Sequence, residues 1–494
     1  MVKSLDHQVV AHHLRLVGLV DAGVGTGSGP ARVQILDRPG ALTAPEALEF
    51  AQGGGECIAL LPAEAFCAAL SVESSSGVGE AYAIFKSSDH RTGSMARLRT
   101  LHPNRRFHHP RGERALVDST GDAAWLRLPV GTGGVLFVGT DLARDLVRYR
   151  QGDPSKAASR PTDAMWGIPG ERPNYLFEEQ LAGEKPSERH ADWWAIALAR
   201  LMAKHLLRPL RSIVPDGAPG AVIITGDDDQ AYLEKYADQL QVLGDTPVTY
   251  FLHPLTRHNR WTLRQMLGKP WIDLGLHPDA LNRPGRYPEL LRDQVAWFRS
   301  LVGRGPISLR NHGFLNDGYW GHLGPWLDQS IRISSNLPGL DGRVLNGSLL
   351  PARVTRDAVL SSHWSLLTSL GDGMRFALGM TDEHAAQRVF DTADAIRQSE
   401  IPGVLVLNLH PQNITETRGM HLAAIEVIRS GFHPWTMHEC LEWFERLDGS
   451  QPRVEASVQD GSFWRVWQWF KGGFFYRSSN SLASFVQLNL DGHI

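Results

Sequence analysis

Short apolar runs alternate with amphipathic stretches along most of the chain. In its second half the apolar runs occupy residues 221–225, 247–252, 271–276, 306–309, 331–335 and 403–409. Between them, the segment 287–302 has one apolar face at helical spacing, made of Leu291, Val295, Phe298 and Val302. Strands alternating with helices predict a parallel sheet covered by helices. About seven such units would fit a closed or nearly closed (β/α) barrel, with functional groups at the carboxyl ends of its strands.

The first half shows a similar α/β alternation with a different boundary. Apolar runs recur within 14–139, and the sequence APEALEFAQ between two of them is typical of a helix. Proline, glycine and charged residues then dominate 151–190, and a helix is expected from about Ala191. The pattern predicts four parts. These are an α/β domain over 1–150, a linker and connecting helix over 151–214, a barrel over 215–450, and a β extension over 451–494.

Composition narrows the classes of function. The 494 residues carry a formal net charge of −3, so no overall field favours nucleic acid or an anionic membrane. No run of apolar residues is long enough to span a bilayer, and the first twenty residues lack a secretory pattern. The cysteines are too few and too scattered for a disulfide framework. We expect a cytoplasmic protein without a membrane span; nothing in the sequence indicates an oligomeric state.

Polar side chains follow several of the predicted strands. In chain order they are Asp227, Asp228, Asp229, His253, His277, Asp279, Arg310, His312 and His410. Strand ends of one barrel meet at one rim, where Asp and His can bind a divalent metal and a further Asp and His can move protons. Loops are polar in any case, and the three aspartates could instead cap a helix over 230–240. Because several strands share the feature, we favour a site.

Four short motifs in this half resemble those of the NodB-type polysaccharide deacetylases, which are carbohydrate esterase family 4-like enzymes with a distorted barrel. In chain order they are TGDDD (225–229), HPDAL (277–281), RNHGF (310–314) and LNLHP (407–411). The resemblance covers about 215–450. It implies an α/β fold with a distorted (β/α)7-type barrel.

The resemblance also implies catalytic roles. Asp227 matches the base, Arg310 the arginine that orients the base, and His410 the general acid.

For the metal, Asp228 and His277 match ligands, but Leu281 stands where the family has its second histidine. His312 is the first substitute, and the other candidates are Asp229, Asp279, His253 and His258. Zinc is the expected ion, with manganese, cobalt or nickel as alternatives.

By this resemblance the chain is a metal-dependent hydrolase that removes acetyl groups from an acetylated polysaccharide or glycan precursor. Tyr319 and Trp320 could stack on a sugar ring, or could simply pack in the core. A second hypothesis is a catalytically degenerate, carbohydrate-binding or scaffold protein that keeps the barrel without a full metal site. A third is hydrolysis of another C–N bond in a substrate that is not a sugar.

The first domain resembles flavodoxin-like and class I glutamine-amidotransferase-like folds without their catalytic machinery. Its glycine-rich segment 23–29 lacks the lysine of a phosphate-binding loop. Cys57 begins an apolar run instead of occupying a strand-to-helix turn, so it is expected in the core.

Overall fold

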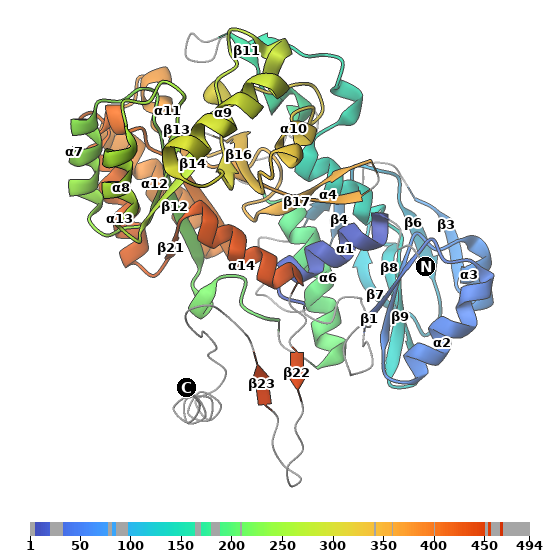
Figure 1. Cartoon of the computed structure of the whole chain (residues 1–494). Coiled ribbons are helices and arrows are strands. Elements are labelled where there is room, and N and C mark those ends of the chain that lie inside the picture. The colour runs from blue at the N-terminus through green and yellow to red at the C-terminus, as the bar shows by residue number, and fades with distance from the viewer. Residues whose placement is uncertain are drawn as a thin grey trace.

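A computed structural model of the chain is shown in Figure 1. It describes residues 5–19, 33–77, 82–84, 97–163, 169–178, 188–207, 210–339, 342–357, 359–399, 401–449, 453–455 and 465–467. The glycine-rich segment 23–29 and most of the predicted β extension lie outside these residues. Within the extension, β22 (Arg453–Glu455) pairs antiparallel with β23 (Arg465–Trp467).

The first half forms a sheet of mixed strand direction. Its strands are β1 (Val33–Asp37), β2 (Glu56–Leu60), β3 (Glu73–Ser76), β4 (Tyr82–Ile84), β5 (Arg97–Arg99), β6 (Arg105–His108), β7 (Glu113–Val117), β8 (Ala123–Val130) and β9 (Gly133–Val138). The strands β1, β2 and β9 are parallel, whereas β9, β8 and β7 are antiparallel neighbours. An α/β unit is therefore present, but a flavodoxin-like or amidotransferase-like arrangement is not confirmed.

Helices bury both faces of this sheet. They are α1 (Leu5–Leu16), α2 (Ala44–Gln52), α3 (Glu64–Ala69), α4 (Leu142–Gln151) and α6 (His190–Leu206). Along β9, Val135 and Phe137 pack with residues of α2 and α3, while Leu136 and Val138 pack with residues of α1, α4 and α6. The alternation follows from the two-residue period of a strand. Cys57 is fully buried in the first of these clusters, as expected.

The second half forms a larger sheet in the order β17-β18-β16-β15-β14-β13-β12-β20-β19, with β21 also paired to β12. Its strands are β12 (Gly220–Asp227), β13 (Val248–Leu252), β14 (Ile272–Leu276), β15 (Ser308–Leu309), β16 (Ile333–Pro338), β17 (Ala352–Arg356), β18 (Val359–Thr368), β19 (Leu370–Gly371), β20 (Gly403–Asn408) and β21 (His433–Trp435). All neighbours are parallel except β17 and β18. The strands predicted for this half are all present; β17, β18, β19 and β21 were not expected.

Two strands near opposite ends of this order, β18 and β19, follow one another in the chain. β18 pairs with β16, and β19, only two residues further on, pairs with β20. Ser369 between them donates its N–H to the carbonyl of Val406 at 2.9 Å. Both faces of β12 are buried, since Ile223 and Ile224 pack in different clusters.

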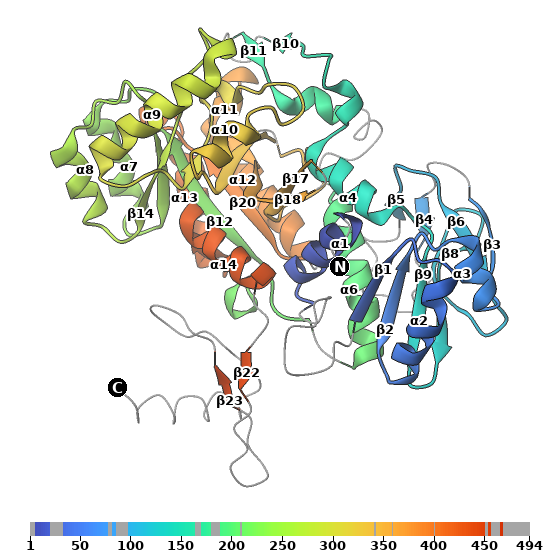
Figure 2. The same cartoon turned by 45° about the vertical axis from the view of Figure 1, so that its right-hand side comes forward.

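Helices surround this sheet in both views (Figures 1 and 2). They are α7 (Leu233–Leu243), α8 (Arg260–Leu267), α9 (Tyr287–Val302), α10 (Leu323–Asp328), α11 (Gly373–Ala377), α12 (Asp382–Gln398), α13 (Arg418–Arg429) and α14 (Met437–Gly449). Helix α9 buries Leu291, Val295 and Phe298 of the face predicted from the sequence, and half-buries Val302. No described helix combines the length and apolarity needed to cross a bilayer.

The buried carboxylate of Asp192 links α6 to α4 and to the segment that precedes β17. Asp192 is fully buried, and accepts hydrogen bonds from Ser348 Oγ (2.5 Å) and from the N–H of Leu349 (3.0 Å). Arg189 Nε and Arg150 Nη2 donate to the same carboxylate at 2.8 and 3.3 Å. Because two arginines share one acid, Asp192 neutralises charge that burial would otherwise penalise.

Candidate metal and acid–base site

Strand β12 delivers Asp227 to a buried, fully hydrogen-bonded position. Arg310 Nη1 donates to its Oδ1 at 2.8 Å, and Asn408 Nδ2 donates to its Oδ2 at 2.8 Å. Arg310 is held by Thr225 and Ser335 and is itself completely buried. Burial alone would raise the pKa of Asp227, but Arg310 and the nearby histidines outweigh it and lower that pKa. Asp227 is therefore an ionised acceptor in a fixed orientation.

Asp228, the ligand implied by the motif, points elsewhere. Tyr236 donates its hydroxyl to Oδ1 at 2.6 Å, and the N–H of His253 donates to Oδ2 at 3.2 Å. The carboxylate is fully buried and engaged by both oxygens. It is not part of either group of residues with metal-ligand spacing among the described residues.

Asp229, the next residue, lies beside His277 and His312. Its backbone lies in the left-handed region, with φ of 40°, so the chain turns directly after the strand. Its Oδ1 lies 3.2 Å from His277 Nε2 and 3.6 Å from His312 Nε2. Tetrahedral zinc ligands about 2.0 to 2.1 Å from the ion would be about 3.3 Å apart. The spacing of these atoms fits a shared divalent cation.

The protons of this group fit a metal as well. The Nδ1 of His277 lies 2.7 Å from the carbonyl oxygen of Arg310, so Nδ1 carries a hydrogen, and in the neutral ring Nε2 presents a lone pair. Among the described residues, His277 Nε2 and Asp229 Oδ1 are buried and have no hydrogen-bond partner. Orphaned buried polar atoms that face one another are a feature of a site built for an ion.

His410 faces the two acids from the end of β20. Its Nδ1 lies 2.5 Å from Asp372 Oδ1, and its Nε2 lies 3.7 Å from Asp227 Oδ2 and 3.5 Å from Asp229 Oδ2. Burial would lower the pKa of His410, but Asp372 and then the other two carboxylates raise it to about 10. At neutral pH the ring is therefore a cation whose Nε2 faces the carboxylates of Asp227 and Asp229.

A second group with metal-ligand spacing consists of His253, Asp279 and His312. It shares His312 with the first group. His258, the last alternative, lies with Nδ1 3.1 Å from Thr262 Oγ1 and its ring against Tyr236. It belongs to neither group of described residues.

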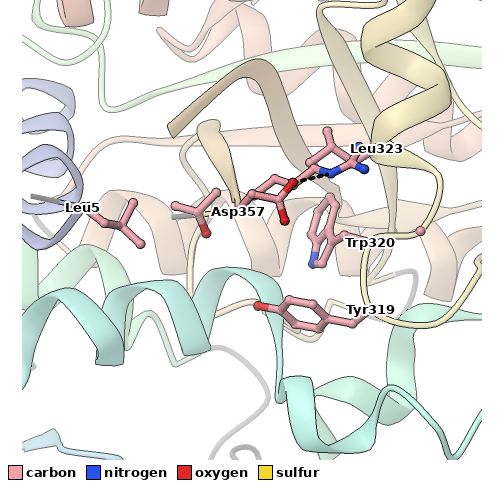
Figure 3. Close-up of a pocket in the computed structure, with 8 residues that line it drawn as sticks. Leu5, Tyr319, Trp320, Leu323 and Asp357 are labelled. Carbon is pink, nitrogen blue, oxygen red and sulfur yellow. Dashed lines mark ion pairs between the residues drawn. The ribbon is translucent and has the colours of Figure 1, made fainter. Parts of the chain in front are cut away.

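Tyr319 and Trp320 line a different pocket, shown in Figure 3. Its volume is about 380 Å³, and its other lining residues are Leu5, Gly321, Leu323, Thr355, Arg356 and Asp357. Trp320 Nε1 donates to the carbonyl of Gln151 at 2.9 Å. The structure thus does not bring these aromatic residues to the acid–base site.

Two partners in the site had no role in the sequence prediction, namely Asp372 and Asn408. Asp372 follows β19, which was not expected, so nothing marked it as a strand end. Asn408 lies within the motif LNLHP, two residues before His410, and its side chain donates a hydrogen bond to Asp227 Oδ2.

Comparison with known proteins gives fold-level matches only. No protein-family profile and no curated protein matches the chain. Among solved structures, one from Mycobacterium smegmatis, provisionally described as a polysaccharide deacetylase, is 17% identical with a TM-score of 0.38, covering 51% of this chain and 100% of its own. Puue allantoinase is 14% identical with a TM-score of 0.39, covering 48% and 94%. The chitin deacetylase of Colletotrichum lindemuthianum is 17% identical with a TM-score of 0.32, covering 46% and 89%. These likenesses carry no conclusion about activity.

Proposed function

We propose that the chain is a metal-dependent hydrolase that removes acetyl groups from an acetylated polysaccharide or glycan precursor. One observation carries the proposal. His410 Nε2 lies within 4 Å of both an arginine-held carboxylate, Asp227, and a carboxylate with metal-ligand spacing, Asp229. Acid, base and ion-binding groups thus meet at one point, which is what acyl hydrolysis needs. The four motifs favour an acetylated sugar as the substrate.

The candidate ligands are Asp229, His277 and His312, in place of the motif's Asp228. When bound there, a divalent cation, zinc first, would polarise the acetyl carbonyl and lower the pKa of water. Two histidines and one carboxylate suit zinc.

The chain's own residues would move the protons. Asp227 takes the proton of the attacking water, while Arg310 and Asn408 keep its carboxylate in place. His410 then donates its Nε2 proton to the departing amine or alkoxide, while Asp372 holds Nδ1. The pKa of Asp227 is lowered and the pKa of His410 is raised to about 10, so at neutral pH the base is ionised and the acid is protonated.

We also propose the wider arrangement expected from the sequence. The second half would be a NodB-type barrel closed through β18 and β19, and the parts would divide at about 150, 214 and 450. If a sugar stacks on Tyr319 or Trp320, it would bind in the pocket of Figure 3, which both residues line. A cytoplasmic location also remains a proposal.

Acetate release from acetylated oligosaccharides tests the activity. In Asp227→Asn we expect a loss of about 10²- to 10⁴-fold in kcat, because the general base is gone, with the metal content unchanged. The matched control is Asp238→Asn on the exposed side of α7, which should keep the full rate. An unchanged rate in Asp227→Asn would contradict the assignment. Wild-type protein that binds no metal would favour the degenerate, carbohydrate-binding alternative.

A further inference from the structure

Asp279 lies between two histidines at the edge of the candidate metal site. Its Oδ2 is 3.5 Å from His253 Nε2, and its Oδ1 is 3.3 Å from His312 Nδ1. Neither ring nitrogen has a hydrogen-bond partner of good geometry among the described residues. The carboxylate is therefore the group available to both. Two roles are open to this group: its three residues bind a second ion, or Asp279 orients the ring of His312.

The backbone around His253 decides between these two readings. The N–H of Leu255 donates to His253 Nδ1 at 3.1 Å, so Nδ1 carries no hydrogen. In a neutral ring the hydrogen is then on Nε2, the atom that faces Asp279. A nitrogen that carries a hydrogen cannot bind a metal. His253 is thus a donor to Asp279, and a second ion is disfavoured.

The same reasoning sets the orientation of His312. Its Nδ1 faces Asp279, and its Nε2 lies 3.6 Å from Asp229 Oδ1. A hydrogen on Nδ1, donated to the carboxylate, leaves a lone pair on Nε2 for the ion. Contacts from a carboxylate to a metal-bound histidine fix its tautomer and make it a stronger ligand.

Asp279 is itself held rigidly. Its N–H donates to Gln294 Oε1 at 2.9 Å, and Gln294 Nε2 donates to its carbonyl at 2.7 Å, which anchors the loop to α9. The N–H of Leu281 donates to Asp279 Oδ1 at 3.1 Å. Leu281 occupies the position at which the resembling motif has its second histidine. The loop that lacks this histidine instead supplies a fixed carboxylate.

We infer that Asp279 is a positioning residue that holds His312 in the Nδ1–H tautomer, so that a histidine from another strand completes the metal site. The inference rests on the proposed metal-dependent function. It explains how the site could bind an ion although Leu281 cannot contribute a ligand.

Calorimetric titration of the metal-free, full-length protein with zinc tests this role without any substrate. We expect one site in the wild type. In Asp279→Asn the dissociation constant should rise about 10- to 100-fold, because a neutral amide oxygen accepts the Nδ1 hydrogen of His312 less strongly than a carboxylate does, and the amide N–H₂ would face the ring N–H of His253. The matched control, Asp293→Asn, removes an exposed carboxylate on α9 and should leave zinc affinity unchanged.

The outcomes separate the inference from the function. One zinc in the wild type with unchanged affinity in Asp279→Asn overturns only the role of Asp279. Two zinc ions per chain, one of them lost in His253→Gln, would do the same by making Asp279 a ligand. No zinc in the wild type overturns the proposed function and this inference with it. Should Asp279→Asn fail to fold, ¹⁵N NMR of the wild-type imidazoles still decides, since the inference requires His312 to carry its hydrogen on Nδ1, and a hydrogen on Nε2 of His312 would overturn it.

Discussion

His363 should make the protein less stable in mild acid. It lies on β18, fully buried, with Nδ1 3.0 Å from the carbonyl oxygen of Ile331 and Nε2 2.9 Å from Ser334 Oγ. Burial lowers the pKa of this ring from 6.5 to about 4. Below pH 6.5 the unfolded chain binds a proton that the native ring refuses, so stability falls as pH drops towards 4. At pH 5 the free energy of unfolding should be lower by about 2 kcal/mol through this group alone.

Replacement by a residue that does not titrate isolates this contribution. His363→Gln keeps an amide donor and acceptor but binds no proton. Urea denaturation with a chelator present, at pH 7.5 and pH 5, gives the loss of stability for each protein. The loss should be smaller in His363→Gln than in the wild type by about 2 kcal/mol. His384→Gln, at an exposed position on α12, is the matched control and should lose as much as the wild type. Equal losses in wild type and His363→Gln would refute the reasoning.

Three further substitutions test the buried polar contacts. Asp192→Ala leaves Arg150 without its counter-charge, and should lower the free energy of unfolding in urea by about 3 to 5 kcal/mol; a loss below about 1 kcal/mol would contradict this. Asp372→Asn weakens the hold on His410 and should reduce kcat for acetate release about 10²-fold while metal content, measured by mass spectrometry, stays constant; loss of the metal would argue against this division of roles. Tyr236→Phe removes a hydrogen bond to the buried carboxylate of Asp228 and should lower the free energy of unfolding by about 1.5 to 3 kcal/mol in thermal or urea unfolding. The metal content should stay constant, because Asp228 is not one of the proposed ligands; loss of the metal would indicate that it is.

The sequence predicted the strands of the second sheet because their apolar runs are buried on both faces. It did not predict β18, whose run VLSSHWSLLT mixes apolar residues with serines and a buried histidine. Asp372, which follows that missed segment, was missed for the same reason. The proton partner of His410 therefore became visible only in three dimensions.

Strand alternation is a second criterion by which the sequence could rank the three aspartates. Side chains alternate along a strand, so an alternation continued past Asp227 would put Asp227 and Asp229 on one face and Asp228 on the other. Motif matching put more weight on adjacency than on alternation. What no pattern could show is the turn at Asp229, or that Tyr236 would occupy Asp228. Similarly, the sequence does not indicate which pocket Tyr319 and Trp320 line.

The metal centre is tested most directly by anomalous X-ray diffraction from crystals grown with zinc. We predict a single strong peak with about 2.0 to 2.2 Å to a carboxylate oxygen of Asp229 and about 2.0 to 2.1 Å to Nε2 of both His277 and His312. A peak bound by Asp228, or no peak among these residues in zinc-saturated crystals, would contradict the proposed site.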